Sequence, residues 1–423
     1  MTSGYHSRVT ADSPYAVFRI RNFRLYVSAV VMVTLATMIQ GTIVGWQVYD
    51  LTHDPLALGL IGLAEAVPYI VMSLYAGHVA DQHNRRTVAV WALALLLAGA
   101  LALVALPTLL GGHPVWLVRA IFVVIVTSGF ARSFMVPARQ ALGAEIVPRE
   151  LFPRSVTWRS GAWQLAAVIG PALGGGLYAL GGTRLSYTVD AVLLTVGIVM
   201  LLLMDHTHVV RAVMHDSIIE SLAAGVRFVF NERIVLGALS LDLFSVLFGG
   251  ATALLPVYAA EILHVGPEGL GLLRSAPAIG AVVMSAWLAH ARPFERTGRV
   301  LLSAVAVYGI TIIVFGASTH FAGAVLALAI GGAADMISVF IRSTLLTTRT
   351  PPEMLGRVMS VNGIFVGSSN EIGAFESGVT ARWFGAVTSV ILGGVLTLGT
   401  VALTAWRNPT LRRLRRMNPA EPA

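Results

Sequence analysis

The chain has 423 residues, of which 56% are hydrophobic and only 12% are Asp, Glu, Lys or Arg. Average soluble domains carry about 25% charged residues, so this composition excludes an ordinary soluble enzyme, a disordered chain and a nucleic-acid-binding protein. The absence of cysteine excludes disulfides, cysteine metal sites and a thiol nucleophile. All 29 basic residues are Arg, and the formal net charge is +8. Because a guanidinium stays charged in any surroundings, this charge is expected to mark one face of a membrane.

Twelve apolar runs are long enough to cross a bilayer, which takes about 20 helical residues. They are residues 25–49, 57–77, 87–109, 115–136, 156–180, 185–204, 235–259, 269–289, 300–318, 321–341, 358–380 and 383–405. The first run is longer than the apolar part of a signal peptide, so we expect a retained span. The predicted fold class is an all-α membrane protein with twelve transmembrane helices in two six-helix halves.

The placement of Arg predicts the orientation of these spans. Segments on the side of the two termini hold 23 of the 29 Arg, whereas the hairpins on the other side hold only Arg184 and Arg382. We therefore expect a multi-pass protein of the bacterial inner membrane with cytoplasmic N- and C-termini. The expected division is a leader (1–24), a first bundle (25–204), a connector (205–234), a second bundle (235–405) and a basic tail (406–423).

The connector contains a segment, 217–230, whose apolar spacing is typical of an amphipathic helix on the inner membrane surface. His206, His208 and His215 precede this segment, and we interpret them as solvated side chains. We therefore expect no metal site and no cofactor. Without Lys there is no phosphate-binding loop of the G-x-x-x-x-G-K type, so ATP-driven transport is not supported.

The two halves are predicted to be an internal duplication. Their loops run 7, 9, 5, 19, 4 and 9, 10, 2, 16, 2 residues. Three short segments also match loosely between the halves: 81–85 with 295–299, 148–154 with 351–357, and 170–175 with 373–378. A parallel repeat of this kind is typical of transporters whose cargo binds between the halves near the membrane midplane.

Several motifs resemble the major facilitator superfamily. Residues 77–86, GHVADQHNRR, resemble its loop signature G-x-x-x-D-x-x-G-R-[KR], with Asn84 in place of Gly; both residue types tolerate a left-handed turn. Residues 166–175, AAVIGPALGG, resemble the fifth-helix signature of the antiporters, G-x-x-x-G-P-x-x-G-G. Residues 137–142 are similar to the drug-efflux branch that includes the enterobactin exporters. The resemblance covers the whole chain and implies a major facilitator fold and proton-coupled export.

The loop signature predicts a gate on the cytoplasmic side. Asp81 is expected to cap the N-terminus of the eleventh span, where the helix dipole favours a carboxylate. Arg85 is expected to hold Asp81 or a neighbouring carboxylate. The other predicted gating residues are Arg86, Glu295 and Arg299. The alternative is a tight loop that only satisfies the topology.

The fifth-span signature predicts a hinge or seal, because small residues let helices approach closely and proline bends the helix axis. The residues are Gly170, Pro171, Gly174 and Gly175. The alternative is that these residues serve packing alone.

Ten ionisable residues lie inside the predicted spans, where each costs about 2.5–3.5 kcal/mol at the bilayer centre. Sorted by depth, eight of them form two layers that can be neutral by pairing: Arg119, Asp190, Arg274 and Glu376 in the outer layer, and Arg132, Arg159, Asp242 and Asp335 in the inner layer. Glu65 and Glu371 lie near the midplane, with no Arg at their depth. We predict that these two acids couple transport to protons, followed by Asp242 and Asp335. The alternative for each is a carboxyl hydrogen-bonded to a neighbouring helix backbone.

Six side chains lie on spans that line the central cavity in this family, and amide and aromatic groups there suit an amphipathic organic cargo. These candidate substrate-binding residues are Gln40, Gln47, Tyr69, Trp163, Gln164 and Asn362. Packing is the alternative for each.

The predicted protein is a monomeric secondary transporter in the lipid bilayer that exports a small-molecule substrate (a drug, siderophore or metabolite) by proton antiport and alternating access. It has no nucleic-acid partner. The alternatives are a proton-coupled uptake symporter, a lysophospholipid flippase on the same fold, and an intramembrane enzyme or receptor. No Ser, His and Asp lie at one depth, which disfavours an enzyme.

Overall fold

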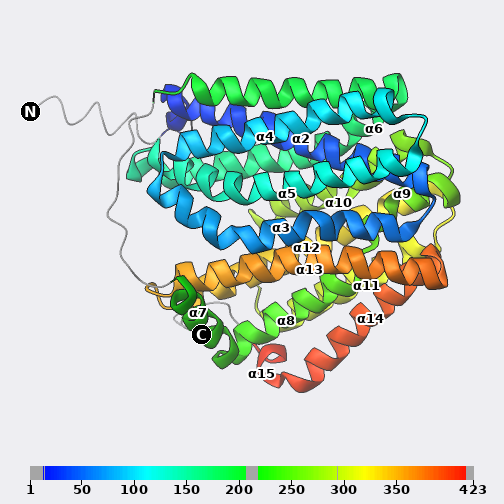
Figure 1. The fold of residues 1–423 in the computed structure, drawn as a ribbon. Helices are drawn as coiled ribbons and strands as arrows, with labels where there is room; N and C mark the ends of the chain where they lie inside the picture. Colours follow the sequence, from blue (N-terminus) through cyan, green and yellow to red (C-terminus); the bar gives the residue numbers. More distant parts are fainter. Residues whose placement is uncertain (1–12, 14, 206–217, 293, 416–423) are drawn as a thin grey trace, which may run out of the picture. The chain divides into compact units, whose positions relative to one another are not determined.

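The computed structural model of the chain describes residues 13, 15–205, 218–292 and 294–415, and these residues are almost entirely helical (Figure 1). Apolar helices form here because each satisfies its own backbone hydrogen bonds, as a segment in lipid must. The elements are η1 (Ala16–Arg19), α2 (Arg21–Thr52), α3 (Pro55–Gln82), α4 (Arg85–Leu110), α5 (Pro114–Glu145), η2 (Arg149–Leu151), α6 (Phe152–Leu202), α7 (Ile218–Asn231), α8 (Arg233–Phe248), η3 (Ala251–Leu254), α9 (Leu255–Val257), η4 (Tyr258–Ile262), α10 (Gly266–Leu288), α11 (Thr297–Ala317), α12 (Phe321–Arg349), α13 (Leu355–Phe384), α14 (Ala386–Arg407) and α15 (Pro409–Arg412).

Ten helical segments in the described ranges are long and apolar enough to span a membrane. One of them contains α6, which covers two predicted spans. The helical path is interrupted between those spans at Gly181 and Gly182, which have φ of −152° and +62°. The predicted span 358–380 lies on α13, whose many polar residues lower its hydropathy below that of the ten. The predicted all-α membrane fold is confirmed, and the count of twelve spans stays a prediction.

The chain forms two compact units. The first comprises Met1–Val44 and Val67–Met214, and the second comprises Gly45–Ala66 and His215–Ala423. The division falls inside α2 and α3. The hairpin that joins these two helices therefore belongs by its contacts to the second unit, although it lies early in the sequence.

The core of the first unit lies among α2, α4, α5 and α6, where fully buried side chains such as Tyr26, Leu93 and Leu142 pack together. α4 runs beside both α5 and α6 (Figure 1). In the second unit, the Tyr258 and Phe315 rings lie 4.5 Å apart within one buried cluster.

The helix predicted over 217–230 is present as α7. Val229 on this helix is fully buried against Val358 and Val361 of α13. Other helices of the protein therefore cover part of the apolar side that is predicted to lie on the membrane surface.

The C-terminal segment covers the first turn of α11. The backbone N–H of Thr297 donates to the carbonyl of Arg415 at 3.2 Å, and that of Gly298 donates to the carbonyl of Leu414 at 3.0 Å. A Cβ on Gly298 would stand 1.7 Å from the carbonyl oxygen of Leu411, so only glycine allows this approach. The contact satisfies donors that a helix N-terminus leaves open.

Candidate functional site

The two predicted midplane acids lie on one helix crossing in the second unit. Glu371 on α13 has its Oε2 atom 2.8 Å from the position that a Cβ would take at Gly62 on α3. Two turns later on α13, a Cβ on Gly378 would stand 2.9 Å from the Cα of Gly59, which lies one turn before Gly62 on α3. Glu65 follows Gly62 by three residues and therefore lies on the same side of α3. Small residues let α3 and α13 approach closely, and this approach places both acids at one interface.

The hairpin between α2 and α3 is also attached to the second unit by polar contacts. The Tyr49 hydroxyl donates a hydrogen bond to Glu261, and Arg382 forms an ion pair with Asp54 at 3.2 Å. A cavity of about 340 Å³ beside these contacts is lined by Tyr49, Glu261 and His53, together with the start of α14. Sequence reasoning missed this polar cavity because its walls come from segments far apart in the chain.

The acids ranked second for proton coupling have different surroundings. Asp242 on α8 forms an ion pair with Arg342 on α12, and both side chains are less than a tenth exposed. Arg342 lies one residue beyond the predicted span 321–341 and is therefore not among the ionisable residues expected inside the spans. Asp335 is half-buried on α12, close enough to Tyr308 of α11 for an electrostatic interaction.

The expected pairing of charges within the outer layer is not found for Asp190. This side chain is fully buried in the first unit, and neither carboxyl oxygen has a hydrogen-bond partner among the described residues. Arg119, which lies at a similar predicted depth, stacks over the Trp116 ring at 5.0 Å. Asp190 is therefore a buried acid without the ion pair that its depth in the membrane predicts.

Arg85, in the loop signature, holds a carboxylate inside the first unit. Its Nη1 lies 2.5 Å from Glu145 at the end of α5, and both side chains are mostly buried. This fits the expectation that Arg85 holds a neighbouring carboxylate. Arg86 donates to the carbonyls of Leu202 and Met204 at 2.5 and 2.7 Å. Both arginines thus fasten the start of α4 to neighbouring helix ends.

Asn84 has a capping function in the same loop. Its side-chain oxygen accepts from the N–H groups of Arg86 at 3.0 Å and Thr87 at 3.3 Å. Its φ is −61°, so the left-handed conformation that Asn and Gly both tolerate is not used at this position. Asn at this position, where the family signature has Gly, caps the helix with its side chain.

The other predicted gating residues are not brought together within either unit. Asp81 lies in the last turn of α3, and its side chain lies outside the described part, so its capping role stays a prediction. Glu295 and Arg299 are exposed around the start of α11.

The glycine-proline segment of α6 packs tightly on α2. A Cβ on Gly170 would stand 2.5 Å from the Cβ of Met38, and one on Gly174 would stand 3.2 Å from the Cα of Ile39. The backbone of α6 stays helical at Pro171 and departs from helical geometry only at Gly181 and Gly182. This geometry favours a seal between α6 and α2 over a hinge at the proline.

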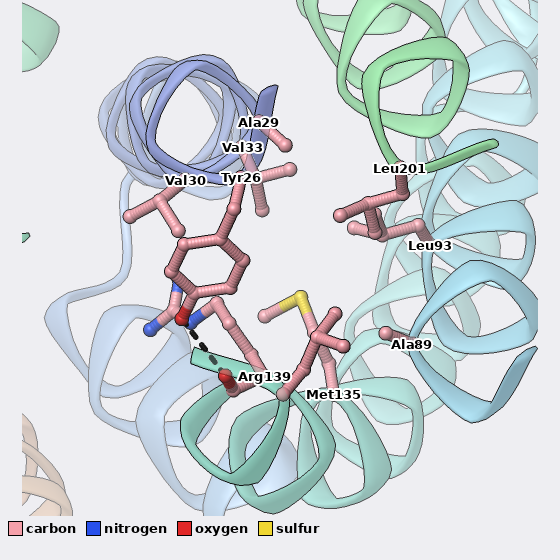
Figure 2. Close-up of a pocket in the computed structure, with 10 residues that line it drawn as sticks. Tyr26, Ala29, Val30, Val33, Ala89, Leu93, Met135, Arg139 and Leu201 are labelled. Carbon is pink, nitrogen blue, oxygen red and sulfur yellow. Dashed lines mark hydrogen bonds between the residues drawn. The ribbon is translucent and has the colours of Figure 1, made fainter. Parts of the chain in front are cut away.

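The predicted substrate-binding residues are divided between the units: Gln40, Tyr69, Trp163 and Gln164 lie in the first, and Gln47 and Asn362 lie in the second. Trp163 is 46% exposed, whereas Gln47 is buried. The side-chain oxygen of Asn362 is buried without a hydrogen-bond partner in the described ranges. A small cavity lined by Tyr26, Met135 and Arg139 (Figure 2) is about 20 Å³, room for about one water molecule and too small to enclose a whole organic cargo.

No group of three or more His, Asp or Glu side chains that could hold a metal ion occurs in the part of the chain that the structure describes. The three histidines of the connector lie outside the described residues.

Comparisons with known proteins agree with this fold. Two curated relatives are both named enterobactin exporter EntS. The protein from Citrobacter koseri is 27% identical over 385 residues, covering 87% of this chain and 89% of the relative. The protein from Shigella flexneri is 26% identical and covers 87% and 88%.

Two solved structures share the fold at low identity. A peptide transporter of the POT family in complex with sulfate matches with a TM-score of 0.70 and 15% identity, covering 94% of this chain and 96% of that one. A bacterial homologue of the human lysosomal transporter Spinster, in an inward-facing, unoccupied conformation, matches with a TM-score of 0.70 and 14% identity, covering 95% and 99%.

The family profile described as transmembrane secretion effector matches residues 12–420. This match confirms a transporter and overrules the alternative of an intramembrane enzyme. The chain therefore belongs to the transmembrane secretion effector family of the major facilitator superfamily and is a secondary transporter.

Proposed function

We propose that this multi-pass inner-membrane protein exports a small organic molecule in exchange for protons by alternating access, with Glu65 and Glu371 as the proton carriers. The relatives are named enterobactin exporters, and this supports export of an organic cargo. The proposed cargo is a siderophore, a drug or a metabolite. The proposal has both termini in the cytoplasm, which the Arg distribution supports, and a monomer as the working unit.

The close crossing of α3 and α13 carries this proposal. A charged carboxylate in apolar surroundings costs free energy, and a protonated one costs much less. Proton binding at Glu65 or Glu371 therefore stabilises the closely packed crossing, and proton loss favours a more hydrated arrangement. A bound proton can shift a conformational equilibrium only by as much as its binding free energy differs between the two conformations.

The other predicted residues have secondary roles in this scheme. Asp242 is held by Arg342, and protonation of Asp242 would release that arginine; Asp335 is the fourth candidate. Asp81, Arg85, Arg86, Glu295 and Arg299 are proposed to stabilise the closed cytoplasmic side. The substrate-binding role of the six amide and aromatic residues stays part of the proposal.

The test uses everted membrane vesicles with an internal pH-sensitive dye and a panel of siderophores, antibiotics and lysophospholipids. An exported substrate should collapse the imposed proton gradient in the unaltered protein. Glu65→Gln and Glu371→Gln should each abolish this response, because an amide cannot carry a proton. Both variants should retain substrate counterflow, which needs no gradient. Glu268→Gln, at an exposed position, is the matched control.

Three results would contradict the proposal. Gradient-driven transport that survives in the double variant would remove the coupling role of these acids. Net movement of the substrate together with protons would identify an uptake symporter. Movement of lysophospholipids alone would identify a flippase.

A further inference from the structure

Two arginines and two tyrosines form a basic cluster in the first unit that the proposed coupling does not use. The cluster consists of Tyr26, Tyr69, Arg139 and Arg159. Tyr26 is fully buried, and its hydroxyl donates to the carbonyl of Arg139 at 2.8 Å. Figure 2 shows Arg139 extending from α5 alongside the Tyr26 ring. The Arg159 guanidinium of α6 lies 5.5 Å from the centroid of that ring.

Glycine at position 143 makes room for this arrangement. A Cβ there would stand 2.6 Å from the Tyr26 hydroxyl oxygen and 2.7 Å from Nη1 of Arg159. The hydroxyl and the guanidinium therefore converge on the same stretch of α5. Arg139 is near enough to Arg159 for the two positive charges to interact, and Tyr69 also lies within electrostatic range of Arg139.

No described carboxylate lies within ion-pair distance of Arg139 or Arg159. Glu145, the one acid on α5, is bound to Arg85 instead. The ring of Tyr26 offers Arg159 a cation–π contact, worth about 0.5–2 kcal/mol, but carries no net charge. The cluster therefore keeps two positive charges on half-buried side chains inside a membrane helix bundle.

Two like charges in such surroundings are costly unless an anion joins them. Guanidinium groups match carboxylate and phosphate oxygens with paired N–H donors, and tyrosine hydroxyls can donate to the same oxygens. Both arginines are half-buried, so they are not sealed from the surrounding medium.

We propose that this cluster is an anion-binding site, and that its ligand is the acidic group of the exported small molecule, such as a carboxylate or a phosphate. The identification of the ligand as the cargo rests on the proposed export function. The binding itself needs no proton gradient, so it can be tested apart from antiport.

The experiment measures thermal unfolding of the purified full chain in nanodiscs of neutral phosphatidylcholine. The probes are benzoate and phenyl phosphate, with benzamide as the uncharged analogue of benzoate. A ligand that binds only the folded state raises the unfolding midpoint, and the rise grows with the ratio of ligand concentration to Kd. Benzoate and phenyl phosphate should raise the midpoint, and benzamide should not.

The variants Arg139→Gln and Arg159→Gln should each weaken benzoate binding by about tenfold or more, the effect of losing one charge-assisted contact. Arg119→Gln, at an exposed position stacked on Trp116, is the matched control and should change the affinity by less than about twofold. Gly143→Ala keeps both charges but places a methyl group where Tyr26 and Arg159 converge. It should also weaken binding, and it tests the site even where the loss of an arginine prevents folding.

Equal stabilisation by benzoate and benzamide would overturn the proposal, as would unchanged benzoate binding in the double arginine variant. A parallel series in nanodiscs containing phosphatidylglycerol separates the two sources of anionic oxygens. Stabilisation by that lipid without any response to benzoate or phenyl phosphate would overturn the assignment to the cargo. A positive binding result together with failed antiport would reject the proposed coupling and leave this site intact.

Discussion

The Glu371 carboxylate lies against α3 at the one point where Gly62 offers no side chain, with Oε2 2.8 Å from the place of the missing Cβ. This contact makes the proposed coupling site sensitive to a single methyl group. The carboxylate end of Glu371 has to move if that methyl group is present, because the separation is shorter than a normal van der Waals contact.

Gly62→Ala should therefore uncouple transport from the proton gradient. The added methyl group displaces the carboxylate that is proposed to carry the proton, and we expect at least a tenfold lower rate of gradient-driven transport, which corresponds to about 1.4 kcal/mol. The measurement is dye-detected gradient collapse in everted vesicles. Gly363→Ala on α13 is the control, since no atom lies within 4 Å of its added Cβ. Equal rates for the two variants would show that the contact with Glu371 does not matter.

Asp190 is predicted to destabilise the protein. A buried polar group without a hydrogen bond costs about 1–3 kcal/mol, and Asp190 has no partner for either oxygen among the described residues. Asp190→Val should therefore raise the thermal unfolding midpoint. Ser186→Ala, one turn earlier, removes a hydrogen bond to the carbonyl of Gly182 and should lower it slightly. A lower midpoint for Asp190→Val would show that the carboxyl makes an interaction that stabilises the folded protein.

The buried ion pair of Asp242 and Arg342 should respond asymmetrically to substitution. Removing one partner leaves an uncompensated buried charge and costs about 3–5 kcal/mol. Arg342→Gln is therefore expected to lower the unfolding midpoint strongly. The double variant Asp242→Asn with Arg342→Gln should recover much of the loss, because neither charge remains. A double variant as unstable as the single one would show that the pair does not interact in the way the structure describes.

The N-cap of α4 gives a graded prediction for the loop signature. Asn84→Ala should cost about 0.5–2 kcal/mol, whereas Asn84→Gly should cost only a few tenths. Asn84→Asp retains an oxygen that can accept from Arg86 and Thr87. The free energy of unfolding in a denaturant titration should therefore rank Asp and Asn above Gly, and Gly above Ala. A glycine variant more stable than the natural protein would refute the capping role.

The helical spans could be predicted from the sequence because a span is a local property. A run of apolar residues of bilayer length must satisfy its backbone as a helix, and the predicted span 87–109 lies inside α4, which runs from Arg85 to Leu110. Composition predicts the ends of these helices less well. α12 extends to Arg349, eight residues beyond the predicted end, so Arg342 and its ion pair were missed.

The candidate sites could be predicted only in part. Depth follows from position along a helix, but the direction in which a side chain points depends on which helices pack together. Asp190 and Arg119 share a depth and still do not pair. Arg139 was assigned to a loop because the predicted span ended at residue 136, whereas α5 continues to Glu145. That continuation places Arg139 beside Tyr26, a contact between residues 113 positions apart.

The docking of the C-terminal segment on α11 has a practical consequence for protein engineering. The carbonyls of Leu414 and Arg415 accept from the first N–H groups of α11. A purification handle or fluorescent fusion should therefore be joined after residue 415, through a spacer. A shortened gene that stops at Arg407 would uncover those donors and loosen a helix more than one hundred positions upstream.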